Sequence, residues 1–225
     1  MPRLRPDWII QKLQKRSPEV LYAVATQQPM VALTIDDGPD PATTARILDA
    51  LQRHGARASF FLITAHLPGN EAAVRRMVEE GHEIGNHMTA DRPSIRLALP
   101  DFERDLLQAH ETLSEFAEVR WFRPGSGWYN GAMLAVAHKH GYRCALGSVY
   151  PYDAWFPSSQ FAAGYVLSRI RPGSVIVLHD RGGRGRRTAS ALERILPELN
   201  RRGLRVVTLS ELVDLQGRLD SVFGW

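Results

Sequence analysis

Short apolar runs alternate along this chain with longer segments in which apolar residues recur every three or four positions. The short runs predict β-strands and the longer segments predict amphipathic helices. Strands that alternate with helices are typical of parallel sheets with helical crossovers, so we expect an α/β barrel or a doubly wound sheet. The expected strands are residues 31–35, 58–63, 82–86, 119–122, 142–146, 174–178 and 204–208, and the expected helices are residues 43–54, 71–80, 100–116, 131–140, 161–170 and 188–201.

Polar residues able to do chemistry follow directly after several of these strands. In a closed barrel the carboxyl ends of all parallel strands meet at one mouth, which is where such folds place their sites. A distorted (β/α) barrel of about seven parallel strands is therefore favoured over an open sheet. The residues concerned are Asp36, Asp37, His87, Asp91, Arg123, Asp153, His179 and Asp180.

The composition is that of one globular domain. The 225 residues are 44% hydrophobic and 23% charged, which is enough to bury a core. We expect an N-terminal arm at residues 1–29 that packs on a main domain at residues 30–225. Apolar spacing over residues 7–25 predicts an amphipathic helix in that arm, interrupted at Pro18. The single cysteine, Cys144, excludes an intramolecular disulfide and is expected to be a buried apolar residue.

The net charge of +4 comes largely from arginine and is too small to indicate nucleic acid as a partner. The Gly/Arg-rich segment 181–187 is expected to be a solvated loop, with contact to an anionic ligand as the alternative. No run reaches the roughly 18–20 apolar residues of a membrane span, and no apolar core follows Arg3 and Arg5 as in a signal peptide. We therefore expect a cytoplasmic protein, or one of the cell envelope or exterior if an export signal is missing from this sequence.

The strand at residues 31–35 leads directly into two adjacent carboxylates, Asp36 and Asp37. Neighbouring side chains on a strand point to opposite faces, so the two can share one pocket only where the strand breaks. Gly38 and Pro39 supply that break. An ordinary acidic turn before a helix is the alternative for these four residues taken alone.

The segment 81–91 places the imidazole of His87 at a strand end and the carboxylate of Asp91 four residues later. Together with Asp37 they form a set of one histidine and two carboxylates, which suits a divalent ion that keeps positions open for water and substrate. Taken alone, a histidine such as His87 is more often a hydrogen-bonded structural residue, but Asp36 and Asp37 before it and His179 after it favour the metal site.

Residues 34–39 and 85–87 resemble the first two motifs of the polysaccharide deacetylases, which share the NodB homology domain and form carbohydrate esterase family 4. The resemblance implies that Asp36 is the general base and that Asp37 and His87 are metal ligands. The second motif normally continues to another metal-binding histidine, where this chain has Asp91. Zinc is then the first expectation for the metal, with manganese, iron, cobalt or nickel as alternatives.

Three further segments resemble the later motifs of the same family. Residues 123–127 resemble the third, which implies that Arg123 orients the base and that a backbone N–H near Ser126 holds the oxyanion. Residues 153–155 resemble the fourth in loosened form, and residues 174–180 resemble the fifth. The roles implied there are a carboxylate beside the catalytic histidine for Asp153, a general acid for His179, and walls of the acetyl pocket for Trp155 and Val177. Because a general acid must be cationic, we expect either Asp153 or Asp180 to lie near His179 and raise its pKa.

The resemblance implies a metal-dependent hydrolase that removes N-acetyl groups, or alternatively O-acetyl groups, from an amino-sugar polymer or oligomer such as chitin or peptidoglycan. Two alternatives stay open. One is hydrolysis of a non-sugar amide on the same scaffold, because a fold constrains mechanism more than substrate. The other is a non-catalytic carbohydrate-binding relative that has lost its metal through the change to Asp91.

Overall fold

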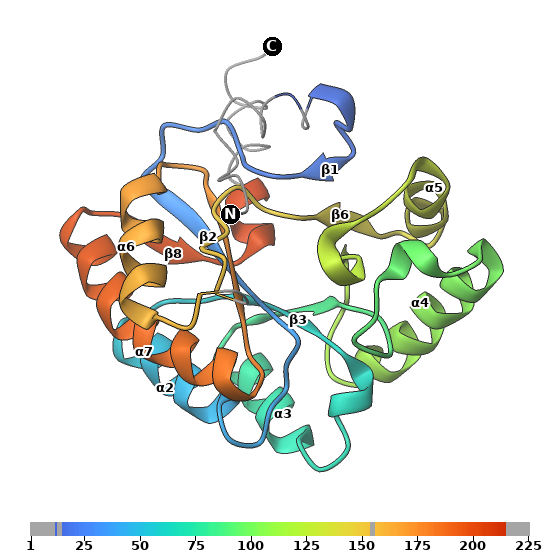
Figure 1. Cartoon of the computed structure of the whole chain (residues 1–225), viewed down its shortest axis with the longest axis horizontal. Helices are drawn as coiled ribbons and strands as arrows, with labels where there is room; N and C mark the ends of the chain where they lie inside the picture. The colour runs from blue at the N-terminus through green and yellow to red at the C-terminus, as the bar shows by residue number, and fades with distance from the viewer. Residues whose placement is uncertain (1–11, 13–14, 154–155, 215–225) are drawn as a thin grey trace.

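All seven predicted strands are present in the computed structural model, which describes residues 12, 15–153 and 156–214 (Figure 1). The predicted boundaries hold to within two residues at every strand end. An eighth strand of two residues joins them in the described chain. The strands are β1 (Val20–Leu21), β2 (Met30–Asp36), β3 (Ser59–Leu62), β4 (Glu83–Asn86), β5 (Trp121–Phe122), β6 (Arg143–Ala145), β7 (Val175–His179) and β8 (Arg205–Val207).

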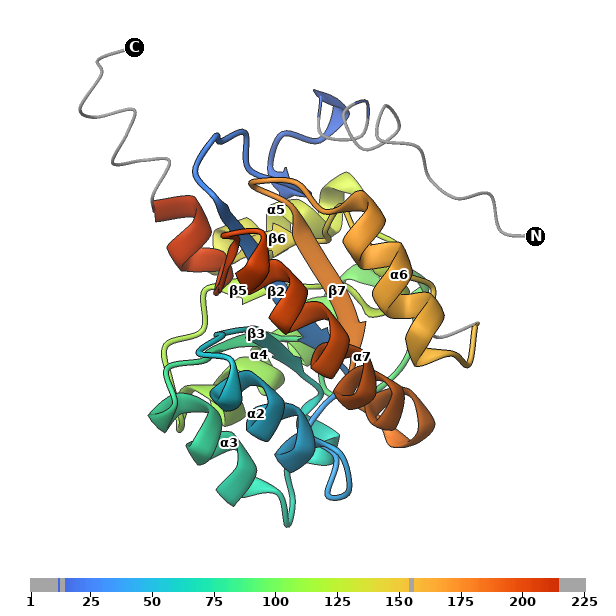
Figure 2. The same cartoon turned by 90° about the vertical axis from the view of Figure 1, so that its left-hand side faces the viewer.

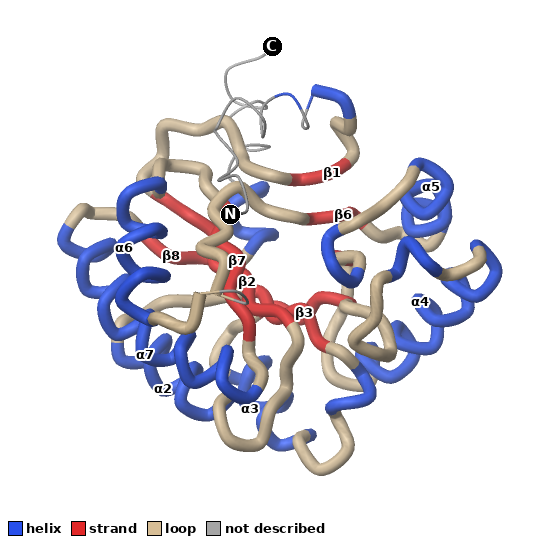
Figure 3. Tube along the Cα trace, viewed as in Figure 1, coloured by secondary structure: helices blue, strands red, loops and turns tan. Residues whose placement is uncertain are grey.

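The strands form one parallel sheet in the order β1-β6-β5-β4-β3-β2-β7, with β8 also paired to β2. The chain beyond β6 then returns to β7, where Val149 forms an isolated parallel bridge with Ile176. This bridge brings the two sides of the sheet together. The expected distorted (β/α) barrel is therefore confirmed, and the helices lie around the outside of the strands (Figure 3).

The helices follow the predicted alternation. They are α2 (Thr44–Arg53), α3 (Glu71–Glu79), α4 (Leu99–Ser114), α5 (Gly131–Lys139), α6 (Ser159–Arg169) and α7 (Gly182–Arg201), with short 3-10 turns η1 (Thr64–His66), η2 (Ser94–Arg96) and η3 (Gly125–Gly127). Each of α2, α3 and α5 is followed by a glycine with positive φ, namely Gly55, Gly81 and Gly141. Only glycine adopts this conformation without steric cost, which is why these residues end their helices.

One boundary was predicted wrongly, at the start of α7. The helix begins at Gly182, six residues before the expected position, so the Gly/Arg-rich segment is its first turn and not a loop. Two tertiary contacts outweigh the poor helix propensity of glycine. Asp40 accepts a hydrogen bond from the Gly182 N–H at 2.9 Å, and Gly185 packs directly on Thr43 and Asp180.

The central strands are apolar and fully buried. Every residue of β2 and of β7 is buried, as expected for strands covered on both faces, and the two run side by side through the molecule (Figure 2). Cys144 is buried and free, and burial raises the pKa of its thiol to about 12, which agrees with its expected apolar role.

The N-terminal arm is described only in part, because residues 1–11 and 13–14 lie outside the described residues. Within the described part, Val20 and Leu21 form β1 and pair with Cys144 and Ala145 of β6, so the helix expected there is wrong at these positions. Among the described helices, none is long and apolar enough to cross a membrane.

Candidate active site

The candidate site lies where β2 and β7 end. Asp36 is the last residue of β2 and His179 the last of β7, and the two are direct partners in the register of the parallel pair. Adjacent strands lie about 4.8 Å apart, so this register places a carboxylate and an imidazole next to each other at the mouth of the barrel. Both residues are buried.

Asp36 is held by Arg123, which directly follows β5. The Nη1 atom of Arg123 lies 2.5 Å from Oδ1 of Asp36 and 2.9 Å from Oγ1 of Thr34, and its Nε donates to the carbonyl oxygen of Ala145 at 2.8 Å. The guanidinium also lies over the Phe61 ring, with its central carbon 4.0 Å from the ring centroid. The Asp36 carboxylate therefore has a fixed orientation and a fixed positive partner.

His179 is held by Asp153. Its Nδ1 lies 2.9 and 3.0 Å from the two carboxylate oxygens, so Nδ1 carries a proton and Nε2 is the atom available to a substrate. Burial alone would lower the pKa of His179, but the charge and hydrogen bond of Asp153 outweigh it, with smaller contributions from Asp36 and Asp37, and raise it to about 9. The imidazole is therefore cationic at neutral pH.

The adjacent carboxylate, Asp180, points elsewhere, although the sequence leaves open which of the two partners His179. Asp180 accepts hydrogen bonds from the hydroxyls of Thr43 and Thr44, both at 2.5 Å. Burial raises the pKa of Asp180 to about 6 despite these bonds. Its role in the structure is to hold the start of α2 against the end of β7.

Asp37 and His87 face each other across the mouth. Asp37 has φ of 73°, in the left-handed region, so its side chain leaves the direction of the strand and enters the same pocket as Asp36. His87 Nδ1 lies 2.7 Å from the carbonyl oxygen of Arg123 and must donate to it, which leaves the Nε2 lone pair directed at Oδ1 of Asp37, 3.6 Å away.

This pair fits one edge of a metal site. Two donors that bind zinc at about 2.0–2.2 Å in tetrahedral geometry lie roughly 3.3–3.6 Å apart, which matches the separation of His87 Nε2 and Asp37 Oδ1. The hydrogen bond from Nδ1 to a carbonyl fixes the tautomer that a metal-binding histidine needs. One neutral nitrogen and one carboxylate oxygen are also suitable donors for a first-row divalent ion.

Asp91 is not brought to this pair. It is exposed, and no three His, Cys, Asp or Glu side chains are grouped to hold an ion anywhere in the described part of the chain. The segment around it is fixed by buried Asp105, which accepts from the N–H of Thr89 at 3.1 Å, from the Thr89 hydroxyl, and from Arg92 at 2.8 Å. The role of Asp91 as a ligand stays a prediction.

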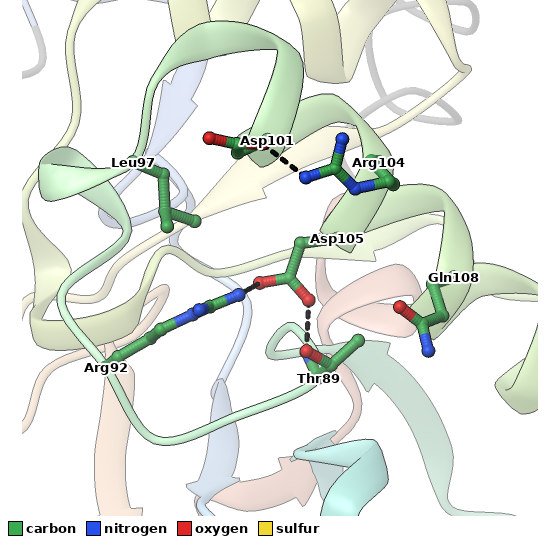
Figure 4. Close-up of a pocket in the computed structure, with 7 residues that line it drawn as sticks. All are labelled: Thr89, Arg92, Leu97, Asp101, Arg104, Asp105 and Gln108. Carbon is green, nitrogen blue, oxygen red and sulfur yellow. Dashed lines mark hydrogen bonds and ion pairs between the residues drawn. The ribbon is translucent and has the colours of Figure 1, made fainter.

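These contacts border a polar pocket of about 310 Å³ beside α4 (Figure 4). Asp105 points into it between Thr89 and Arg92, and the exposed ion pair of Asp101 with Arg104 lies above it (Figure 4). The lining residues are Thr89, Arg92, Leu97, Asp101, Arg104, Asp105 and Gln108. The pocket belongs to the support of the segment after His87 and not to the catalytic pairs.

The predicted substrate-binding residues have different outcomes. Ser126 is exposed in η3 and has φ of 64°. The loop that carries it lies close to the segment around Asp91, since a Cβ on Gly125 would be 2.1 Å from the carbonyl oxygen of Arg92. Val177 is buried two positions before His179, on the same face of β7. Trp155 lies outside the described residues. The binding roles of all three stay predictions.

Two residues at the site were not expected from the sequence. Arg184, from the first turn of α7, lies with Nη1 2.9 Å from Oδ2 of Asp37. The Tyr150 ring packs edge-on against His179, with ring centroids 5.7 Å apart, and burial raises the pKa of its phenol, with nearby Asp153 acting in the same direction. The Gly/Arg-rich segment was the only signal for the arginine, and nothing in the local sequence pointed to the tyrosine.

Comparisons with known proteins agree with this geometry. The family model described as polysaccharide deacetylase matches residues 23–145. A peptidoglycan-N-acetylglucosamine deacetylase of Bacillus cereus is 34% identical over 197 residues, covering 86% of this chain and 92% of the relative. A chitooligosaccharide deacetylase of Sinorhizobium fredii is 33% identical over 199 residues, covering 83% of this chain and 93% of the relative.

Solved structures give the same result. A peptidoglycan N-acetylglucosamine deacetylase has a TM-score of 0.82 and 30% identity, covering 93% of this chain and 97% of its own. A family 4 acetyl xylan esterase from Clostridium thermocellum, in complex with a cobalt ion, has a TM-score of 0.76 and 31% identity, covering 84% and 92%. The model match over more than half of the sequence, together with relatives of this identity and coverage, shows that the chain belongs to the polysaccharide deacetylase family.

Proposed function

We propose that this protein is a metal-dependent deacetylase that hydrolyses the N-acetyl amide of amino-sugar residues in a polymer or oligomer such as peptidoglycan or chitin. The observation that carries the proposal is the register of Asp36 with His179. It sets an anionic base beside a cationic acid, each fixed by its own partner, Arg123 and Asp153. Amide hydrolysis needs both protonation states at once.

The residues of this chain divide the reaction between them. Asp36 is positioned to take the proton from the attacking water, because Arg123 holds its carboxylate in a fixed orientation. His179 is positioned to give its Nε2 proton to the departing amine, because Asp153 holds Nδ1. Backbone N–H groups in the loop around Ser126 are proposed to stabilise the oxyanion, which is worth about 3–4 kcal/mol per donor where it has been measured.

Asp37 and His87 are the proposed metal ligands, with Asp91 as the third. The ion is proposed to be zinc or another first-row divalent metal. When bound, it supplies Lewis-acid activation of water and of the acetyl carbonyl. The tautomer of His87 and its separation from Asp37 Oδ1 support this assignment, and the cobalt complex of the related esterase is consistent with it.

The test is acetate release by purified protein from N-acetylated chitooligosaccharides and from peptidoglycan glycan strands, before and after removal of metal with a chelator. We expect release from at least one of these substrates, loss of activity with chelator, and recovery with added zinc or cobalt. Asp36→Asn is the matched inactive control. A protein that binds the sugars but releases no acetate with any divalent metal would instead be a non-catalytic relative.

A further inference from the structure

Three carboxylates at the mouth of the barrel each pair with a cation. Asp36 pairs with Arg123 and Asp153 with His179, which are contacts that the general base and general acid require. The third pair, Asp37 with Arg184, has no counterpart in the proposed reaction: Arg184 Nη1 lies 2.9 Å from Oδ2 of the proposed metal ligand. The Asp37 side chain is 6% exposed and that of Arg184 is 33% exposed, so the contact is largely shielded from water.

The backbone that carries Arg184 is fixed by close packing at the next residue, Gly185. A Cβ on Gly185 would lie 2.3 Å from Oγ1 of Thr43 and 2.9 Å from Oδ1 of Asp180, so only glycine allows the first turn of α7 to pack there. Asp180 and Thr43 are themselves joined by a 2.5 Å hydrogen bond. Arg184 therefore projects from a turn that is fixed against the end of β7, and its side chain needs no rearrangement of the helix to reach Asp37.

The two oxygens of Asp37 consequently face different groups. Oδ1 faces His87 Nε2 at 3.6 Å, where an ion fits, and Oδ2 is held by the guanidinium of Arg184. A cation at this position has two effects on a divalent ion. It limits the carboxylate to one coordinating oxygen, and it repels the ion at short range through a poorly screened environment.

We propose that Arg184 is the internal counter-ion of the metal-ligating Asp37, a positioning residue that weakens metal binding while it keeps the bound ion electron-poor. The inference rests on the proposed function, because it takes Asp37 as a ligand.

The experiment measures the dissociation constant of zinc for the full-length protein by competition with a chromophoric chelator, a readout independent of acetate release. Arg184→Gln is expected to bind zinc about tenfold more tightly and to have a lower kcat. Arg184→Lys retains the charge and is expected to stay close to the parent affinity. Arg186→Gln, an exposed arginine two residues further along α7, is the matched control and should change neither quantity.

A background variant separates coupling through Asp37 from a general effect of charge. In Asp37→Asn, the further change Arg184→Gln should tighten binding by a smaller factor than in the parent protein, because only the direct repulsion of the ion remains. Unchanged or weaker zinc binding by Arg184→Gln, while the parent protein binds zinc, would overturn the counter-ion role and leave the proposed function standing. Failure of the parent protein to bind zinc or any tested divalent ion would overturn both.

Discussion

Replacing Asp153 by asparagine removes the charge that keeps His179 protonated while it retains a side chain of the same size and an oxygen that can accept from Nδ1. The pKa of His179 is raised from 6.5 to about 9 in the folded protein, even though burial acts in the opposite direction. At 1.36 kcal/mol per pH unit, the shift corresponds to about 3 kcal/mol in favour of the cation. In Asp153→Asn only burial remains as the main influence, so the pKa should fall below 6.5.

The consequence for catalysis follows from the fraction of protonated imidazole. At pH 8 about nine-tenths of His179 is cationic with a pKa of about 9, and less than about 3% with a pKa below 6.5. If the cation is the general acid, kcat/KM for acetate release at pH 8 should fall at least about thirtyfold. The alkaline limb of the pH profile should move from about pH 9 to below pH 6.5.

The same shift makes a prediction for stability. His179 binds a proton more tightly in the folded state than in the unfolded state, so its contribution is fully present below pH 6.5 and is lost as the pH rises through about 9. The contribution of His179 to the free energy of unfolding, measured with denaturant, should therefore fall by about 3 kcal/mol between pH 6 and pH 10 in the parent protein. Asp153→Asn should show no such fall.

The assay is kcat/KM for acetate release between pH 5.5 and 10, together with an NMR titration of the His179 ring. Asp180→Asn is the matched control, because it changes the neighbouring buried carboxylate, which bonds Thr43 and Thr44 and not the imidazole. An alkaline limb that stays near pH 9 in Asp153→Asn would refute the argument that Asp153 sets the charge of His179.

Three further predictions concern the base, the third ligand and its support. Asp36→Asn should abolish acetate release without changing the metal content found by elemental analysis, since Asp36 pairs with Arg123 and is not a proposed metal ligand. Loss of metal in this variant would contradict its role as the base. Asp91→Ala should release metal and lose activity together, and full metal content with full turnover would show that Asp91 is not a ligand. Asp105→Ala should lower the free energy of unfolding in urea by about 2 kcal/mol, because the partly buried donors on Thr89 lose their acceptor. The exposed Asp101→Ala should change it by less than about 0.5 kcal/mol.

The sequence predicted the strands well because their signals are local. Each is a short apolar run, and the helices between them end at Gly55, Gly81 and Gly141, where a positive φ excludes other residues. β1 was not predicted, because two residues carry no periodicity and become a strand only through pairing with β6. The start of α7 was placed too late for a related reason: its glycines disfavour a helix locally, and their packing on Thr43 is a tertiary contact.

Some residues of the candidate site could be predicted from the sequence and others could not, again because tertiary contacts are not visible in the local sequence. Motif order identified Asp36, Asp37, His87 and His179, and their strand ends do meet. The sequence could not decide whether Asp153 or Asp180 partners His179, because both lie near it in the chain or in the fold and only side-chain direction separates them. Side-chain direction is likewise what leaves Asp91 exposed at a position where spacing alone predicted a ligand.

Adjacent identical residues acquire different chemistry here through one backbone angle. Asp36 ends β2 in regular strand geometry, and its carboxylate pairs with Arg123, which follows β5. Its register partner is His179, the last residue of the neighbouring strand β7. Asp37 has φ of 73°, which is uncommon for a residue with a side chain and turns its carboxylate toward His87 and Arg184. A regular strand would have sent it to the opposite face, where neither partner lies. The different roles proposed for Asp36 and Asp37 therefore depend on the turn that starts at Asp37. A substitution that relaxes this turn should impair metal binding even when both carboxylates are retained.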